Sequence, residues 1–435
     1  MKQFIYIPFL LILLVSACHR REVAPIYVLG ESGIQATGAY LTTDQQGNPV
    51  LCWTEQDRKD SLNRLKYAVY DRQQQKFSDA ITVTTSAGCS TAAESMGKVA
   101  FKSDGTVIAL FAKKFSGEKN PYAGAICYSI SPDGKNWSVA NYLHSDTAHA
   151  YGRSFFDIER LRDGELAAVW LDGRFGKAIK GSALFFNRTS KGKGFGADTC
   201  LDKGTCECCR TDLLSDDQGG LHLAYRSIQI PDMLSGRQVR DMVYKFSADD
   251  GRTFSAARPI SRDNWEISGC PHTGPSLAML GRSAGVTWFT AGGGAPGLYC
   301  TTALPGAGFK NRKLVTATGK HPQMITLPEG HTLMVCEEPV EETAATQAHQ
   351  PSESMEMDHS KGQIMQHGPA GSAKIVLYRM SGGQAAGNIV LTDGKQADHH
   401  AVLAGIGNQL VAAWVREEKG RSEIAYMTIQ PQWDE

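Results

Sequence analysis

The stretch Ser247-Ala248-Asp249-Asp250-Gly251-Arg252-Thr253-Phe254 decides how this chain is expected to fold. It follows the apolar run 242–246, which predicts a β-strand. Asp249 can accept hydrogen bonds from backbone N–H groups two positions on, and Ser247 can do so more weakly. Gly251 supplies a left-handed backbone position without steric cost. Phe254 starts the next strand and can pack under the turn, so the stretch predicts a tight turn between two strands.

A shorter relative of this turn, Ser131-Pro132-Asp133-Gly134-Lys135-Asn136-Trp137, lies upstream and also follows an apolar strand. The arrangement of Ser, Asp, Gly and an aromatic resembles the Asp box of sialidase-like β-propellers. The alternative is two ordinary β-hairpin turns. The residues that carry the resemblance are Ser131, Asp133, Gly134 and Trp137 in the first turn and Ser247, Asp249, Gly251 and Phe254 in the second.

A two-strand unit recurs along the chain and favours the propeller over isolated hairpins. A turn Gly opens most units, and the units are roughly 50–60 residues apart except across the sixth, which is a propeller-like period. The first strands of the units are 47–53, 105–111, 164–170, 220–225, 284–289, 333–336 and 409–414. One such unit could not bury its apolar face alone, so stacking around a ring is expected. We predict an all-β propeller of six or seven blades, seven slightly favoured, in which the early strand 26–29 completes the last blade and closes the ring.

The bulk composition fits this fold and excludes one class of partner. Lys plus Arg is 45 and Asp plus Glu is 45 over 435 residues, so the formal net charge is zero. A nucleic-acid binder would normally carry a basic excess, so no nucleic-acid partner is expected. The oligomeric state is left open.

The N-terminus predicts export. Lys2 precedes the apolar run 4–15, too short for a normal membrane span, and Val15-Ser16-Ala17-Cys18 resembles a bacterial lipobox. Residues 1–18 are therefore expected to be a lipoprotein signal peptide ending at a lipidated Cys18, or alternatively an ordinary signal peptide with an incidental Cys. We expect 19–34 to hold the tether and ring-closing strand, and 35–435 to form a propeller in the bacterial cell envelope, attached to the membrane through its lipid only.

Two segments carry possible metal ligands, each with an alternative. Cys200 and Cys206-Glu207-Cys208-Cys209 could hold a soft metal, but disulfides within the segment or to Cys270 are the favoured alternative in an exported chain. An insertion at about 338–372 is rich in His and Met and could bind copper, or it is a mobile polar loop with incidental His and Met. Asp398-His399-His400 is interpreted as a structural turn. No cofactor and no metal site is assigned.

Candidate substrate-binding residues follow the predicted central strands. Arg153, Asp157, Asp172 and Arg174 should point toward the propeller mouth, where a guanidinium offers a two-pronged partner for the carboxylate of an acidic sugar. The alternative is Arg–Asp pairing that locks one blade to the next.

The motifs Cys-x-Cys-Cys-Arg at 206–210, Tyr225-Arg226, Val239-Arg240-Asp241 and Trp265-Glu266-Ile267-Ser268-Gly269-Cys270-Pro271 resemble a bacterial branch of exo-α-sialidase-like, Asp-box (BNR) repeat lipoproteins. The resemblance covers most of residues 35–435. It implies three Arg that hold a carboxylate, a Tyr–Glu nucleophile pair and an Asp acid/base.

The implied site transfers only in part, because the early Arg-Ile-Pro motif of that family is missing and no Arg lies around 38–41. The substrate-binding candidates are Arg153, Arg174, Arg210, Arg226 and Arg240. The catalytic candidates are Tyr225 and Glu266 as a nucleophile pair and Asp157 or Asp172 as acid/base. Three functions remain open: an exo-glycosidase acting on terminal acidic sugars, a non-catalytic propeller that binds a glycan or protein, and a copper- or metal-handling envelope protein.

Overall fold

The computed structural model describes residues 24–31, 33–231, 234, 236–267, 271–304, 308–340, 372–431 and 433. These residues form thirty-one strands and two short 3-10 helices, η1 (Thr84–Ser86) and η2 (Gly176–Ala178), so the prediction of an all-β chain is confirmed. Within the described ranges no helix is long and apolar enough to cross a bilayer. The predicted signal peptide with Cys18, and residues 341–371 of the predicted insertion, lie outside the described residues.

The first half of the chain forms three antiparallel sheets in sequence order. The first contains β2 (Ala36–Thr43), β3 (Pro49–Gln56), β4 (Asn63–Asp71), β5 (Lys76–Phe77) and β6 (Ile81–Thr82). The second contains β7 (Lys98–Phe101), β8 (Val107–Lys114), β9 (Gly124–Ser131) and β10 (Asn141–Tyr142). The third contains β11 (Arg153–Arg160), β12 (Leu166–Asp172), β13 (Ser182–Ser190), β14 (Lys193–Phe195) and β15 (Thr199–Thr205).

The second half continues the pattern. The fourth sheet contains β16 (Asp212–Ser215), β17 (Leu221–Arg226), β18 (Met242–Ser247) and β19 (Arg258–Pro259). The fifth contains β20 (Ser276–Leu280), β21 (Ser283–Thr290), β22 (Gly297–Leu304), β23 (Gly308–Phe309) and β24 (Lys313–Thr316). The sixth has eight strands: β25 (Lys320–Thr326), β26 (Thr332–Pro339), β27 (Ala373–Ser381), β28 (Gln384–Val390), β29 (Ala397–Ile406), β30 (Gln409–Glu418), β31 (Arg421–Ile429) and β1 (Tyr27–Leu29).

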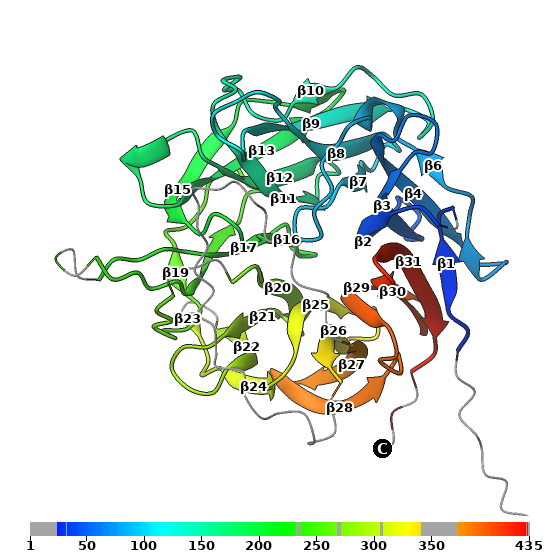
Figure 1. The fold of residues 1–435 in the computed structure, drawn as a ribbon. Coiled ribbons are helices and arrows are strands. Elements are labelled where there is room, and N and C mark those ends of the chain that lie inside the picture. Colours follow the sequence, from blue (N-terminus) through cyan, green and yellow to red (C-terminus); the bar gives the residue numbers. More distant parts are fainter. Residues whose placement is uncertain are drawn as a thin grey trace, which may run out of the picture.

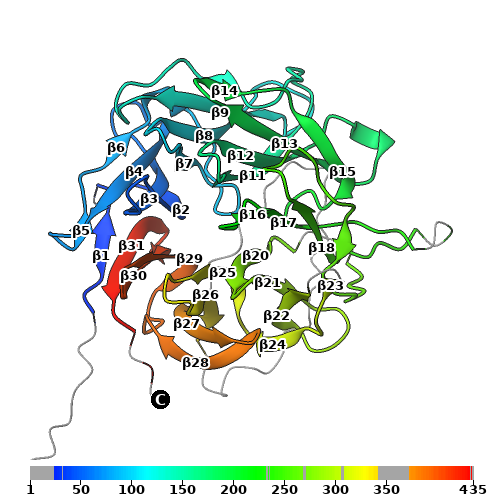
Figure 2. The same ribbon diagram turned by 180° about the vertical axis from the view of Figure 1, so that it is seen from behind.

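The eight-stranded sheet consists of two antiparallel groups, β25–β28 and β29–β31 with β1. A single parallel bridge, Ala373 to Ala397, joins them. The expected pairing of the early strand is present, because Tyr27 to Leu29 run antiparallel to Tyr426 to Ile424 of β31. Figure 2 shows β1 beside β31, next to the first sheet.

The sheets stand around a common centre (Figure 1). The first strand of each group faces that centre, and the later strands lie progressively farther out. The inner strands are β2, β7, β11, β16, β20, β25 and β29. This arrangement brings side chains from distant parts of the sequence to one axis.

Apolar side chains fill the spaces between neighbouring groups of strands. One buried cluster joins β2–β5 to β29–β31, and others join each group to the next along the chain. The recurring tryptophans of the second strands, Trp53, Trp170, Trp288 and Trp414, are fully buried. The Gly-led apolar phrases, predicted as the first strands of their units, are therefore the second strands; they are buried between neighbouring groups, and one further strand separates each of them from the axis.

The turns at 131–137 and 247–254 each contact the preceding sheet. Asp249 accepts hydrogen bonds from Ser247 Oγ and from the backbone N–H of Thr253, which is four positions on rather than the expected two. Phe254 packs edge-on against Phe186 of the preceding sheet. In the shorter turn Asp133 accepts from the N–H of Lys135 and Asn136, and Tyr67 of the first sheet donates to the Gly134 carbonyl.

A belt of hydrogen bonds links the inner strands to one another. In each case a polar side chain of one inner strand accepts a hydrogen bond from a backbone N–H of the next inner strand. The pairs are Asp157 with Leu213, Asp212 with Leu277, Ser276 with Met324, and Gln323 with Leu403.

We call the accepting residue of an inner strand, or the residue equivalent to it in another inner strand, the belt position. Two residues before the belt position, several inner strands are irregular. The register shifts at β2, β11, β25 and β29, and the backbone there has positive φ at Gly38, Phe155, His321 and His400. A β-bulge re-aims the side chains at such a position.

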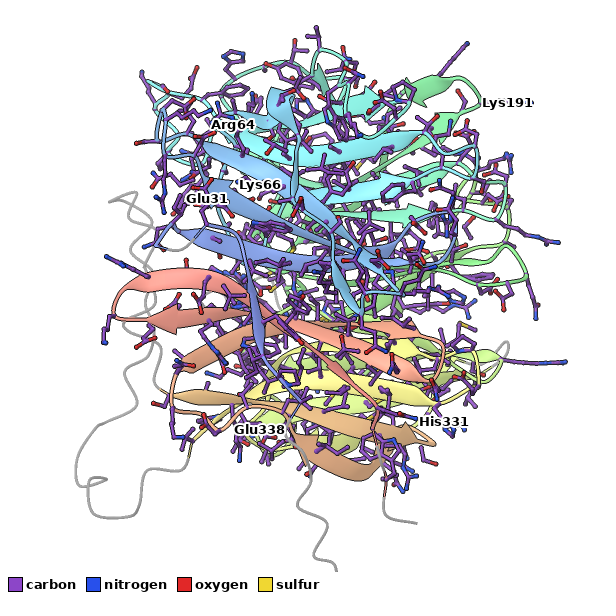
Figure 3. The ribbon with its side chains drawn as sticks, turned by 90° about the vertical axis from the view of Figure 1, so that its right-hand side faces the viewer. Glu31, Arg64, Lys66, Lys191, His331 and Glu338 are labelled. Atoms are coloured by element: carbon purple, nitrogen blue, oxygen red, sulfur yellow. The ribbon has the colours of Figure 1, made fainter. Side chains whose placement is uncertain are left out.

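In the side view of Figure 3, Glu338 and His331 mark opposite ends of β26. We call the face of the molecule at the Glu338 end, which is on the left in Figure 3, the upper face. Lys320 pairs with Glu337, so the bulge of β25 lies at the upper face.

Candidate functional site

Six ionisable side chains meet where the inner strands begin, and we call them the axial cluster. Glu94 precedes β7, Arg210 precedes β16, His321 lies in β25, Glu337 in β26, and His399 and His400 in β29. They come from four of the strand groups, so only the ring-like arrangement of the sheets brings them together.

Glu94 is the hub of this cluster. Its Oε2 lies 2.9 Å from Arg210 Nε, and its Oε1 lies 2.8 Å from His400 Nε2 and 3.8 Å from His321 Nε2. The Glu94 residue is 9% exposed. A buried carboxylate is therefore surrounded on three sides by nitrogen atoms.

A second carboxylate supports both imidazoles from the other side. Glu337 Oε1 lies 2.7 Å from His321 Nδ1, and its Oε2 accepts the backbone N–H of His400 at 2.7 Å. The rings of His321 and His400 stack with their centroids 4.1 Å apart. Both residues have left-handed backbones, with φ of 47° and 52°. Non-glycine residues keep this conformation only when their surroundings hold them, and such residues gather at functional sites.

The charges in the cluster shift one another's pKa. Burial alone would raise the pKa of Glu94, but Arg210 and His321 hold it well below its usual range. For Glu337, burial alone would likewise raise the pKa, but His321 lowers it to about 2. Burial alone would lower the pKa of His321, but Glu337 and Glu94 raise it. Burial and then the charge of His321 lower the pKa of His400 to about 4. Opposed shifts within one cluster mark functional-site candidates.

The short distances around Glu94 are not matched by good hydrogen-bond angles. Among the described residues, neither the two carboxylate oxygens of Glu94 nor the Nε of Arg210 has a well-aligned hydrogen-bond partner, although all three atoms are buried. The ion pairs are therefore close contacts of charge rather than directional bonds.

Arg210 differs from the other candidate arginines in how few contacts its guanidinium makes with the described residues. Its Nε contacts Glu94, and Arg210 makes no hydrogen bond or ion pair with any other described residue. Its side chain is 17% exposed. Arg210 is thus a partly exposed guanidinium at the upper end of the axis, with few contacts to the rest of the described chain.

Three other predicted residues form an ion-pair group with no place in the axial cluster. Asp172 Oδ2 lies 3.2 Å from Arg153 Nε and 2.6 Å from Arg174 Nη2. Arg174 Nη2 also contacts Asp198 at 2.7 Å, and Arg153 reaches Asp146 in the preceding connection at 3.3 Å. This pattern corresponds to the alternative of Arg–Asp pairing that ties neighbouring segments together.

The predicted catalytic residues are separated from one another. Asp157 accepts from Lys98 Nζ at 2.6 Å and belongs to the belt. The Tyr225 hydroxyl donates to Asp202, and burial, reinforced by Asp202, raises the Tyr225 pKa. Glu266 is half exposed and pairs with Arg237 at 3.0 Å. Among the described residues, no hydrogen bond, ion pair or ring contact joins Tyr225 to Glu266.

Arg226 and Arg240 are buried beside the Cys segment. Arg226 donates to the carbonyls of Arg240 and Phe289 at 2.8 and 2.9 Å. Arg240 Nη1 lies 3.2 Å from both Cys206 Sγ and Glu207 Oε2. Cys206 and Cys209 are free thiols with their sulfurs 3.3 Å apart. The predicted disulfide to Cys270 stays a prediction, because Cys270 lies outside the described residues.

The opposite end of the axis is hollow. A cavity of about 670 Å³ is lined by residues that include Tyr40, Glu159, Arg160, Asp216 and Gln323. Burial and the nearby Asp157 raise the pKa of Glu159 to about 8. The axis therefore has a charged, closely packed upper end and an open lower one.

Sequence reasoning selected Arg210 but missed the rest of the axial cluster. His399 and His400 were interpreted as a turn, and Glu94, His321 and Glu337 were not selected. The usable signal was the alignment of the repeats on their inner strands. Arg210, His321 and His400 each stand two residues before the belt position of their strand, which is Asp212, Gln323 or Val402.

Comparison with known proteins places the fold but no family. No protein-family model and no curated protein matches the chain. A protein of unknown function from Dyadobacter fermentans is 12% identical, covers 95% of this chain and 99% of its own, and has a TM-score of 0.50. The polysaccharide lyase Uly1 is 10% identical, with 96% and 94% covered and a TM-score of 0.53. An ulvan lyase bound to -[GlcA(1-4)Rha3S]- is 11% identical, with 92% and 95% covered and a TM-score of 0.50.

Weaker likenesses, with TM-scores of 0.42 to 0.47, include a sialidase, an α-L-arabinofuranosidase and an α-L-arabinanase. Of the three neighbours with TM-scores of 0.50 or more, two are polysaccharide lyases by name. At these identities the likeness establishes a shared fold only.

Proposed function

We propose that this chain binds an acidic glycan at the upper mouth of its axis and cleaves a bond next to the acidic sugar. The observation that carries this proposal is Arg210 of the axial cluster, whose guanidinium is partly exposed and forms its only ion pair, among the described residues, with Glu94. A guanidinium presents two parallel N–H donors to a carboxylate, which gives both affinity and orientation.

The other candidate arginines already make hydrogen bonds or ion pairs within the protein. Arg153, Arg174 and Arg226 each donate to acceptors of the chain, and Arg240 contacts Cys206 and Glu207. Withdrawing one of them to bind substrate would leave a buried acceptor or charge unpaired, which is costly. Arg210 can bind a carboxylate without that loss.

The named actions of the fold neighbours agree with an acidic glycan. Two of them are polysaccharide lyases, and one was bound to an oligosaccharide that contains GlcA, an acidic sugar. The finer proposal of an exo-α-sialidase rests on the motif resemblance. For that activity Tyr225 would have to exchange its bond to Asp202 for substrate.

The proposal includes a seven-bladed ring. Counting β25–β28 and β29–β31 with β1 as separate blades gives seven groups, and the cluster between β2–β5 and β29–β31 packs the first against the last. In this arrangement β1 closes the ring by completing the seventh blade. We further propose that the chain is exported and anchored through Cys18, which would place the mouth in the envelope where polysaccharides occur.

A product assay separates the possible reactions. The purified full chain is incubated with a sialoside, a uronic-acid oligosaccharide and a neutral oligosaccharide of similar length. Hydrolysis releases a sugar without a new double bond, whereas elimination produces an unsaturated uronic acid with ultraviolet absorbance. We expect product from an acidic substrate and none from the neutral one.

Two variants make this assay specific for the mouth. Arg210→Ala should abolish turnover, while Arg258→Ala, an exposed arginine on the outer strand β19, should leave it unchanged. Saturable binding without product would favour the non-catalytic propeller. Neither binding nor turnover with any acidic glycan would overturn the proposal.

A further inference from the structure

We propose that Glu94, His321 and His400 form a binding site for one divalent transition-metal ion, with Zn²⁺ the best match. One possible ligand atom of each of these three side chains lies within 4.8 Å of the other two. Glu94 Oε1 is 2.8 Å from His400 Nε2 and 3.8 Å from His321 Nε2. A metal bonded to N and O at ~2.0–2.1 Å holds its ligands roughly 3 to 3.5 Å apart, so small side-chain movements complete the site.

The far side of each imidazole is already occupied in the way a metal site requires. His321 Nδ1 contacts Glu337 at 2.7 Å, while its Nε2 points toward Glu94. A carboxylate behind a ligating histidine fixes the tautomer and orients the ring.

His400 has the same arrangement with a longer relay. Its Nε2 faces Glu94, and its Nδ1 lies 2.6 Å from His399 Nδ1. His399 Nε2 in turn contacts Glu417 at 3.2 Å. Both histidines therefore keep Nε2 as the atom available to a metal and use Nδ1 for outer-shell contacts.

The state of Glu94 is an independent observation that points to a cation. Its two oxygens are buried and receive no aligned hydrogen bond from the described residues, although three nitrogen atoms surround them. Buried polar groups are ordinarily satisfied, and an exception calls for an unseen ion or water. A metal between Glu94 and the two Nε2 atoms would satisfy the carboxylate directly.

The ligand set decides the class of metal. Two imidazoles and one carboxylate suit Zn²⁺ and related first-row ions, whereas Ca²⁺ and Mg²⁺ prefer sites made of oxygen atoms. Three protein ligands leave a coordination position open, as in catalytic zinc sites. The open position would bind a water or a substrate oxygen beside Arg210, and this last step alone rests on the proposed glycan function.

Metal binding can be measured without any glycan. The full chain is stripped with a chelator, dialysed, and titrated with Zn²⁺ by calorimetry, and Co²⁺ is used in parallel because its visible spectrum reports nitrogen, oxygen or sulfur ligands. We expect one ion per chain in the high-affinity step and a Co²⁺ spectrum without thiolate charge-transfer bands.

Variants tie this step to the three ligands. His321→Gln and Glu94→Gln should remove the high-affinity step, and Glu337→Gln should weaken it about 10- to 100-fold. His331→Gln, an exposed histidine at the opposite end of β26, and Cys206→Ser should bind as the unaltered chain does. Near-UV circular dichroism of each metal-free variant checks folding, and His400→Gln replaces any variant that does not fold.

Two results would overturn this site. One is high-affinity binding that survives both His321→Gln and Glu94→Gln. The other is a Co²⁺ spectrum with thiolate bands that Cys206→Ser removes, because the ion would then sit at the Cys segment. A chain that binds metal at the three ligands but no glycan would contradict the proposed function and leave the metal site standing.

Discussion

The Oδ2 atom of Asp157 accepts a hydrogen bond from the backbone N–H of Leu213 at 2.8 Å, and so joins the inner strand of one sheet to the inner strand of the next. The other oxygen of Asp157 contacts Lys98 Nζ at 2.6 Å, so one carboxylate connects three strand groups. Asp157 was selected as a catalytic acid/base candidate, and its contacts give it a part in holding the ring together.

We therefore expect Asp157→Asn to destabilise the fold. The amide would turn a donor toward Leu213 or Lys98 and leave the Lys98 charge, only 5% exposed, without a countercharge. Loss of one partner of a buried pair costs about 3–5 kcal/mol. Urea unfolding measures this loss. Asp393→Asn, which breaks the exposed pair with Lys395, should leave the unfolding midpoint unchanged, and equal effects of the two variants would contradict the assignment.

The second prediction concerns the turn at 247–254. Gly251 has φ of +83°, and a Cβ there would lie 2.3 Å from Phe186 Cζ of the preceding sheet. Gly251→Ala should therefore lose the ~1 kcal/mol typical of an unfavourable φ and a further ~1–3 kcal/mol from overpacking. Gly192→Ala is the matched control, because Gly192 has φ of +69° with no atom within 4 Å of the added methyl. Thermal unfolding should rank Gly251→Ala as clearly the less stable; indistinguishable melting temperatures would show that the turn does not pack as described.

The third prediction compares two tryptophans in equivalent second strands. Trp170 and Trp414 are both fully buried, but Trp170 Nε1 donates to Asp172 at 3.1 Å, whereas Trp414 Nε1 finds no hydrogen-bond partner among the described residues. Both Trp→Phe changes remove a similar volume. The free energy of unfolding should fall by ~1–2 kcal/mol more for Trp170→Phe, because Asp172 loses a donor. A larger loss for Trp414→Phe would contradict this reading of the core.

The fourth prediction is a pH dependence at His144, a buried ring stacked on Tyr142. Burial and then the charge of Arg153 lower the His144 pKa to about 4, compared with about 6.5 in an unfolded chain. Between these values the unfolded state binds a proton that the folded state does not, so His144 lowers stability as the pH falls from about 6.5 to about 4.

Unfolding in urea at several pH values across this window measures the effect. His144→Gln should flatten the decline in stability between about pH 6.5 and 4 and change little above it. A variant whose decline is as steep as that of the unaltered chain would show that other groups cause it.

The sequence predicted the parts of the fold that have strong local signals. The turns around Asp133 and Asp249 and the apolar second strands with Trp53 or Trp170 could be recognised because turn chemistry and alternation act over a few residues. The pairing of the early strand with β31 followed instead from the repeat, because a closed ring leaves no exposed strand edge. The inner strands lack such signals. Lys320-His321-Pro322-Gln323 and Asp398-His399-His400 are polar, and their bulges follow from contacts across the axis.

The candidate site was predictable only in part for the same reason. Arg153, Asp172 and Arg174 follow a strong strand pattern and so attracted attention, yet their charges satisfy one another. Glu94 and His400 lie about three hundred residues apart in sequence, and only the closure of strand groups around one axis brings their side chains within 2.8 Å. A carboxylate in a loop before a short strand has no local feature that marks it as the hub of a cluster.

We propose centrally that the guanidinium of Arg210 binds the carboxylate of an acidic glycan. The most direct measurement compares the affinity for one oligosaccharide with its uronic carboxyl intact and the same oligosaccharide with that carboxyl reduced to an alcohol, using the unaltered chain, Arg210→Lys and Arg258→Ala. We predict that the unaltered chain and Arg258→Ala prefer the intact form by about 10- to 100-fold, and that Arg210→Lys loses most of this preference. A preference that persists in Arg210→Lys, or no preference in the unaltered chain, would contradict the account.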